Sequence, residues 1–154
     1  MKKYVLTTAV AAALAMVASP VAAQNKKWFA GPTVGSTWTH GTALGFNGGY
    51  QVNKYLAVET AYDRVFNTAS PINLWSANMV AGYPIDGTKV KPYALAGLGY
   101  QWQRNANQGV WSVGGGVKVE LAKGVDLDAR YRYVQGLWNQ NNQNVVSIGT
   151  IFKF

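Results

Sequence analysis

The sequence contains no cysteine, so no disulfide can brace its fold. It has six acidic residues against fourteen lysines and arginines, and a single histidine, His40. No motif for a metal ion, a nucleotide or a phosphate group is present; the glycines at 114–116 lie inside an expected strand and do not form a phosphate loop. We therefore expect neither a metal nor another cofactor.

Beyond its first 23 residues the chain also lacks any run of about 18 apolar residues, the length that a membrane-spanning helix needs. Hydrophobic residues nevertheless make up 49% of the chain and aromatic residues 13%, with 17 glycines. A strand crosses a bilayer with only about 9–11 residues, because alternate side chains point away from lipid. Any membrane insertion of this chain must therefore use strands.

The first 23 residues have the three parts of a secretory signal peptide. A basic start at residues 1–3 precedes an uncharged apolar run at 4–18, and small residues follow up to Ala23. The apolar run is shorter than the roughly 20 residues of a transmembrane anchor, the competing interpretation. We expect cleavage after Ala23, which leaves 24–154 as one domain with net charge +6, two lysines fewer than the full chain's +8.

The last eleven residues alternate apolar and polar or small side chains and end on an aromatic residue, as the closing strand of an outer-membrane barrel does. A soluble edge strand is the alternative. The face that suits lipid carries Val146, Ile148, Thr150, Phe152 and Phe154.

Seven further segments have the same character, bounded by turn residues. An even number of antiparallel strands brings both termini to one side and lets the sheet close, which removes unpaired edges. The sequence thus predicts an all-β fold, an eight-stranded antiparallel up-and-down transmembrane β-barrel preceded by a signal peptide. The expected strands are residues 28–38, 43–52, 55–65, 72–83, 90–103, 109–121, 125–137 and 144–154.

The connections between these strands alternate in composition. Those after the second, fourth and sixth strands carry Lys54, Asp86, Lys89 and Lys123, whereas the others are rich in Asn, Gln, Thr and Ser. We interpret the first class as periplasmic and the second as short external loops. Lysines near the inner rim can attract anionic phospholipid at about 1 kcal/mol each; simple solubility explains them equally well.

Aromatic residues cluster near both ends of the expected strands, as girdles at two membrane interfaces do. In a soluble sandwich they would concentrate at strand centres. The periplasmic group is Trp28, Tyr50, Tyr55, Tyr83 and Phe154, and the external group is Trp38, Tyr62, Phe66, Trp102, Trp111 and Trp138.

Strand alternation turns most of the charged residues inward. The interior of an eight-stranded barrel is only wide enough for its own side chains, so these charges have to pair. The expected lumen network is Glu59, Asp63, Lys118, Glu120, Asp126, Asp128, Arg130 and Arg132. Glycines at 97, 99, 114 and 116 either give room for long side chains opposite or allow the strands to bend.

Residues 48–55, Gly-Gly-Tyr-Gln-Val-Asn-Lys-Tyr, followed by Glu59 and by Tyr62 with Asp63, resemble the second strand, tight turn and third strand of the OmpA transmembrane barrel family. The resemblance implies a Gram-negative envelope protein that crosses the periplasm with chaperones. It also implies insertion into the outer membrane, among lipopolysaccharide and phospholipid, by the barrel assembly machinery. That machinery would read the closing strand with Phe152 and Phe154.

The chain departs from the family in three respects. Members usually continue into a domain that binds peptidoglycan, whereas this sequence stops at the barrel, and their long external loops are nearly absent. Lys118 stands where the family has Glu, Asp128 where it has Arg, Arg130 where it has Glu and Val80 where it has Lys. We expect Glu59 and Asp128 to pair with Lys118 and Arg130.

We interpret the chain as a non-enzymatic barrel with a structural role in the envelope and a charge-plugged lumen. A small ion or solute pore is the alternative, and a lipid A-modifying enzyme or an adhesin is less favoured. His40 has hydroxyl residues nearby, but the expected external loops hold no acid to orient it. Nucleic-acid binding is disfavoured because the basic residues are dispersed.

Overall fold

The structure is a computed structural model that describes residues 27–38, 41–66, 70–104, 106–138 and 142–154. The expected signal peptide and His40 lie outside these residues. No helix in the described part of the chain is long and apolar enough to cross a membrane. The strands are β1 (Trp28–Thr37), β2 (Gly41–Gln51), β3 (Leu56–Phe66), β4 (Ile72–Gly82), β5 (Val90–Gln103), β6 (Ala106–Ala122), β7 (Val125–Gly136) and β8 (Asn142–Lys153).

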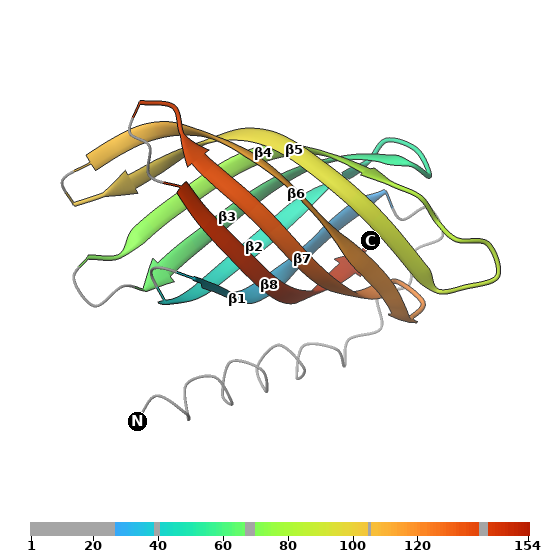
Figure 1. The fold of residues 1–154 in the computed structure, drawn as a ribbon. Coiled ribbons are helices and arrows are strands. Elements are labelled where there is room, and N and C mark those ends of the chain that lie inside the picture. The colour runs from blue at the N-terminus through green and yellow to red at the C-terminus, as the bar shows by residue number, and fades with distance from the viewer. Residues whose placement is uncertain (1–26, 39–40, 67–69, 105, 139–141) are drawn as a thin grey trace, which may run out of the picture.

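The eight strands form a closed antiparallel barrel in which each strand pairs with its sequence neighbours and β8 pairs with β1 (Figure 1). The predicted fold is confirmed. Trp28 and Phe154 exchange two backbone hydrogen bonds, of 2.9 and 3.1 Å, at one end of the barrel. We call this end, at the right of Figure 1, the terminal rim, and the opposite end the distal rim.

Buried and exposed side chains alternate along β3 and β4, as expected for strands in the wall of a barrel. In β3, every second side chain from Ala57 to Val65 is buried and every intervening one from Leu56 to Phe66 is exposed. The same period of two runs through β4. Because the inward positions are filled and the outward ones are mostly apolar, the barrel has a packed interior and a hydrophobic exterior.

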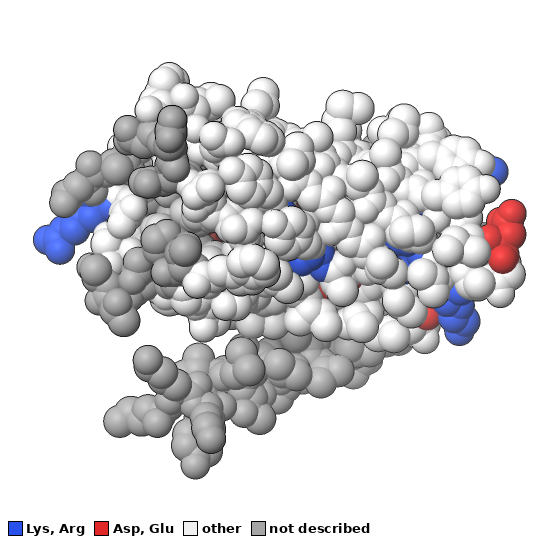
Figure 2. All heavy atoms as spheres, viewed as in Figure 1, with Lys and Arg blue, Asp and Glu red and all other residues white. Residues whose placement is uncertain are grey.

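Pairs of aromatic rings lie on the exterior near both rims. At the terminal rim the rings of Trp28 and Tyr50 lie 4.9 Å apart. At the distal rim Tyr62 lies 6.1 Å from Trp102, and Trp111 lies 5.8 Å from Tyr133. Figure 2 shows a broad band of uncharged side chains between the ends of the visible face, with a few charged atoms of both signs visible between them.

The interior is layered along the barrel axis. A charged and polar middle, built around Arg130, lies between two apolar layers. The layer nearer the terminal rim holds Phe29, Ala57, Val80, Tyr93, Leu95 and Ile151. The layer nearer the distal rim holds Leu74, Val110, Val134 and Val145, with Ala43, Val65 and Ile72 beside it.

Three side chains differ from the faces or burial expected for them. Glu120 is exposed rather than packed in the lumen, because it lies beside the bulge that ends the β6–β7 ladder. Val125, which alternation places on the outward face if Asp126 and Asp128 face inward, is buried next to the same bulge. Thr150 is also buried, because its short side chain lies opposite the larger Leu127 of β7. Alternation therefore weakens where the ladder is irregular or neighbours differ in size.

Candidate functional site in the barrel lumen

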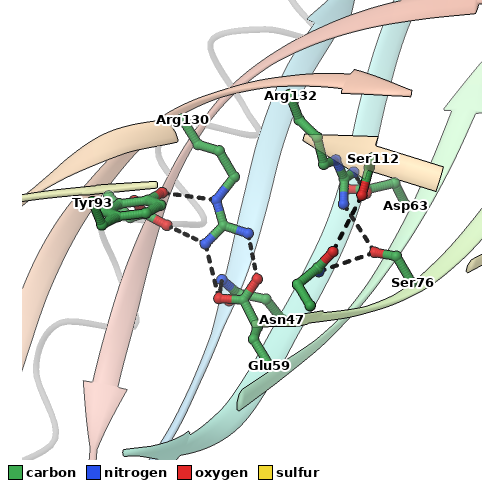
Figure 3. Close-up of polar contacts among 10 residues, drawn as sticks. Asn47, Glu59, Asp63, Ser76, Tyr93, Ser112, Arg130 and Arg132 are labelled. Atoms are coloured by element: carbon green, nitrogen blue, oxygen red, sulfur yellow. Dashed lines mark hydrogen bonds and ion pairs between the residues drawn. The ribbon is translucent and has the colours of Figure 1, made fainter. Parts of the chain in front are cut away.

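Arg130 on β7 is the centre of the charged layer (Figure 3). Its Nη1 and Nη2 donate to the two carboxylate oxygens of Glu59, at 2.5 and 2.9 Å. Nη2 also donates to Asp128 at 2.7 Å, and Nε donates to the hydroxyl of Tyr93 at 2.9 Å. That hydroxyl donates in turn to Asp128 at 2.6 Å. The guanidinium is thus held from three sides by buried partners.

Alternation and barrel closure explain how these groups meet. Asp128 and Arg130 lie two residues apart on β7 and therefore share its inward face. Glu59 on β3 is 71 residues from Arg130 in sequence and reaches it across the lumen. Asn47 on β2 lies beside Glu59, with Nδ2 3.5 Å from Oε2. The contact between Glu59 and Arg130 depends on the closed barrel, because β3 and β7 do not belong to one hairpin.

A second polar layer lies one inward position further along β7. Arg132 forms an ion pair with Asp63 and donates to the Ser76 hydroxyl at 3.1 Å. Asn78 donates to the same hydroxyl at 3.2 Å and accepts from Ser112 at 3.3 Å. These residues come from β3, β4, β6 and β7, so the polar network connects four of the eight strands through their side chains (Figure 3).

Lys118 is buried in the lumen, but it does not form the ion pairs expected for it. Among the described residues it forms no ion pair; its Nζ lies 4.8 Å from the ring centre of Phe29 and 5.1 Å from that of Tyr93. The pairing of Glu59 and Asp128 with Arg130 is present, whereas their pairing with Lys118 is not. Asp126 pairs instead with Lys153 at the terminal rim, at 2.7 Å.

The inward glycines bear on two interpretations of the sequence, room for long side chains opposite and bending of the strands. A Cβ at Gly116 would lie 2.6 Å from the Tyr93 hydroxyl and 2.3 Å from the Ala129 carbonyl oxygen. A Cβ at Gly99 or Gly114 would strike the backbone of the neighbouring strand at 2.1 or 2.2 Å. Gly116 therefore gives room for an inward side chain, and all three allow close approach of backbones.

Sequence reasoning missed Tyr93 and the two apolar layers. Tyr93 lies on the same face of β5 as Gly97 and Gly99, so its inward direction was available from alternation. The apolar layers were also visible as pairs of inward apolar residues flanking Glu59 and Asp63 on β3 or Ser76 and Asn78 on β4.

The arrangement is suited to blocking a passage through the barrel. Within the described ranges no group of three or more His, Cys, Asp or Glu side chains is placed to hold a metal ion. The acids Glu59, Asp63 and Asp128 are engaged by arginines. An ion crossing the lumen would have to pass the layer with Leu74, this paired centre, and the layer with Phe29, against which the Lys118 ammonium lies.

Comparison with known proteins gives the same architecture. A family model described as outer membrane protein beta-barrel domain matches residues 8–154. The N-terminal barrel of Pseudomonas aeruginosa OprF superposes with a TM-score of 0.73 at 17% identity, covering 84% of this chain and 98% of that one. Neisserial surface protein A gives 0.65 at 21% identity, covering 83% and 95%. The outer membrane enzyme PagL gives 0.57 at 14% identity, covering 82% and 99%. Among curated proteins, no sequence matches this chain.

Proposed function

Since this chain belongs to the family of outer membrane protein β-barrel domains, we propose that it is a sealed structural barrel of the bacterial outer membrane. The terminal rim faces the periplasm and the distal rim faces outward. Its role is to stabilise the envelope mechanically and to occupy the membrane without opening it. The observation that carries this proposal is the layered lumen, in which a paired charge cluster lies between two apolar layers.

The apolar layers favour a structural role over a pore. Moving an ion from water into an apolar environment is expensive unless a partner replaces its hydration. Arg130 and Arg132 already use the acids that would attract a cation. Conduction would require two changes at the same time. The ion pairs would have to separate, and water would have to enter both the layer that holds Leu74 and the layer that holds Phe29.

The proposal also excludes catalysis, although PagL shows that the fold itself is compatible with an enzyme. Three of the lumen acids are bound to arginines and unavailable as general bases. Lipid A mass spectrometry of cells with the wild-type chain and with His40→Ala tests this point. A modification that depends on His40 would contradict the non-enzymatic role.

Single-channel recording of the refolded chain in a planar bilayer tests the sealed lumen. We expect no openings above the bare-bilayer baseline from protein shown by circular dichroism to be folded. The double variant Phe29→Ala, Leu74→Ala thins both apolar layers and is expected to leak. Leu98→Ala on the exposed outer face is the control and is expected to stay silent. Reproducible openings of the wild-type chain would replace the structural role with that of a pore.

A further inference from the structure

Arg64 is unusual because it presents a charge on the outer wall. Among the described residues of the eight strands, it is the one charged side chain that strand alternation directs outward; Glu120, which is also exposed, lies beside the bulge at the terminal rim. It lies near the distal rim on β3, between the outward residues Tyr62 and Phe66, and is exposed. A charged residue on the lipid face is strongly unfavourable at the bilayer midplane and nearly tolerated at the interface. Arg64 therefore marks an interfacial position.

No acid of the chain is placed to neutralise Arg64 from outside. Four acids face the lumen, and the other two, Asp86 and Glu120, lie at the terminal rim; the lumen acids are Glu59, Asp63, Asp126 and Asp128. In the described part of the structure the Arg64 guanidinium has no ion pair and lies 5.7 Å from the ring centre of Phe66. The charge of Arg64 is therefore not neutralised by an acid of the chain.

Beside Arg64 is a hollow of about 390 Å³. Asn73, the direct cross-strand neighbour of Arg64, lines it, and Asn73 pairs in turn with Trp102. Adjacent strands lie about 4.8 Å apart, so Arg64 and the far side of the hollow are within reach of one headgroup. The lining residues are Ser70, Pro71, Asn73, Trp102, Gln103 and Arg104.

The lining holds several polar groups beside the Trp102 ring. The Tyr62 hydroxyl donates to Asn73 Oδ1 at 2.8 Å, which leaves the amide nitrogen as a donor for another partner. Tyr62 and Tyr100 flank Trp102 at 6.1 and 6.3 Å. The Ser70 hydroxyl is buried and has no hydrogen-bond partner among the described residues. Arg104 adds a second guanidinium.

We propose that Arg64 and Arg104 bind the phosphate group of an anionic glycolipid in the outer leaflet. Guanidinium groups recognise phosphate oxygens through paired N–H donors. Asn73 and Ser70 supply further polar contacts, and the Trp102 ring offers a flat surface for a sugar. This inference rests on the proposed orientation, because it places the distal rim in the outer leaflet.

The lipid, rather than free phosphate, is the ligand because the site adjoins the apolar wall. Tyr62 and Trp75 lie next along the outer face toward the middle of the barrel, and their polar atoms are already bonded to Asn73 and Thr60. The face below the hollow is therefore suited to acyl chains. A phosphate attached to a lipid would meet the arginines at the height where Arg64 lies.

The test is binding of purified lipopolysaccharide to the refolded full chain in detergent micelles, measured by native mass spectrometry. The same lipopolysaccharide with its phosphates chemically removed is the second probe, and inorganic phosphate is the third. The variants are Arg64→Gln, Arg104→Gln and their combination. Lys89→Gln, at the terminal rim, is the matched control for loss of one positive charge. Circular dichroism checks that each variant is folded.

We expect the phosphorylated lipid to bind at least about tenfold more tightly than the dephosphorylated one. Each single arginine variant is expected to lose about tenfold, since each removes charge-assisted hydrogen bonds. Lys89→Gln should bind as the wild type does. Equal binding of both lipids, an equal loss in Lys89→Gln, or equally effective competition by inorganic phosphate would each overturn the proposal. Because binding in micelles does not depend on orientation or conductance, its failure is separable from failure of the structural role.

Discussion

Gly116 and Gly48 lie on opposite faces of the barrel wall, and the space around them differs sharply. A Cβ at Gly116 would meet the Ala129 carbonyl oxygen at 2.3 Å, whereas a Cβ at Gly48 has its nearest neighbour at 3.5 Å. We predict that Gly116→Ala lowers the free energy of unfolding by about 1–3 kcal/mol through overpacking against Tyr93 and β7. Urea unfolding in lipid vesicles provides the measurement.

Gly48→Ala is the control for that substitution because it adds the same methyl group at an uncrowded outward position. Its expected effect is within about 0.5 kcal/mol. Equal losses in the two variants would show that the crowding at Gly116 is relieved elsewhere.

We predict that, among the lumen residues, Arg130 contributes most to the free energy of unfolding of the barrel. Arg130→Met leaves Glu59 and Asp128 as buried carboxylates without their cation, and loss of one partner of a buried pair costs about 3–5 kcal/mol. The free energy of unfolding in urea should fall by that amount. Replacing all three residues with apolar ones should recover much of it, because a buried ion pair is itself nearly neutral compared with apolar packing. A loss below about 1 kcal/mol in Arg130→Met would contradict the central role of this cluster.

At the scale of the strand, the seam between β1 and β8 is interrupted. Their paired residues include Ala30 with Phe152 and Thr33 with Gly149, with no pair between these two. Pro32 lies in the gap and has no N–H to donate. It still pairs with Phe46 of β2, so the interruption is confined to the closing seam.

We therefore predict faster amide hydrogen exchange at this seam than in the uninterrupted β4–β5 ladder. The amide of Thr150, which points toward β1, should exchange at least about tenfold faster than that of Ala77, which points toward β5, because a local opening at the seam breaks fewer bonds. Exchange measured by NMR in lipid nanodiscs compares the two directly. Equal protection would show that side-chain packing compensates for Pro32.

The strands were largely predictable because alternation is a local property of the sequence. β5 has the expected bounds, 90–103, and the bounds of most others differ by one or two residues. β6 begins at Ala106 rather than at the expected 109, since polar residues at the rim continue the ladder opposite Trp102 and Gln103. The polar composition of the residues before 109 is typical of a turn, but the strands of a hairpin that is exposed to water can be polar and still form backbone pairs.

The ion-pair partners of the lumen residues were less predictable than the side of the strand on which each residue lies. Alternation places Lys118, Arg130, Glu59 and Asp128 inside, but it does not say which cation reaches which acid. That choice depends on strand stagger and on Tyr93, whose hydroxyl takes part in the Arg130 cluster. The position of Lys118 against two aromatic rings follows from the same geometry.

For the whole molecule, the decisive prediction concerns its direction in the membrane. Both ends of the barrel wall meet at the terminal rim, where Trp28 and Phe154 are bonded, and short turns are typical of the periplasmic side. The sequence has no cysteine, so single cysteines can be introduced without background. Thr88→Cys marks the β4–β5 connection at the terminal rim, and Leu137→Cys marks the distal rim after β7.

Intact cells treated with a polyethylene-glycol maleimide too large for outer-membrane pores should modify Leu137→Cys alone. Thr88→Cys should react only after the outer membrane is permeabilised, because its connection would then be reached from the periplasm. Modification of both variants after permeabilisation shows that each thiol is accessible in the folded protein. The reverse pattern in intact cells would place the distal rim in the periplasm. It would then remove the outer-leaflet glycolipid as the ligand of Arg64 and Arg104, since these residues would face the inner leaflet.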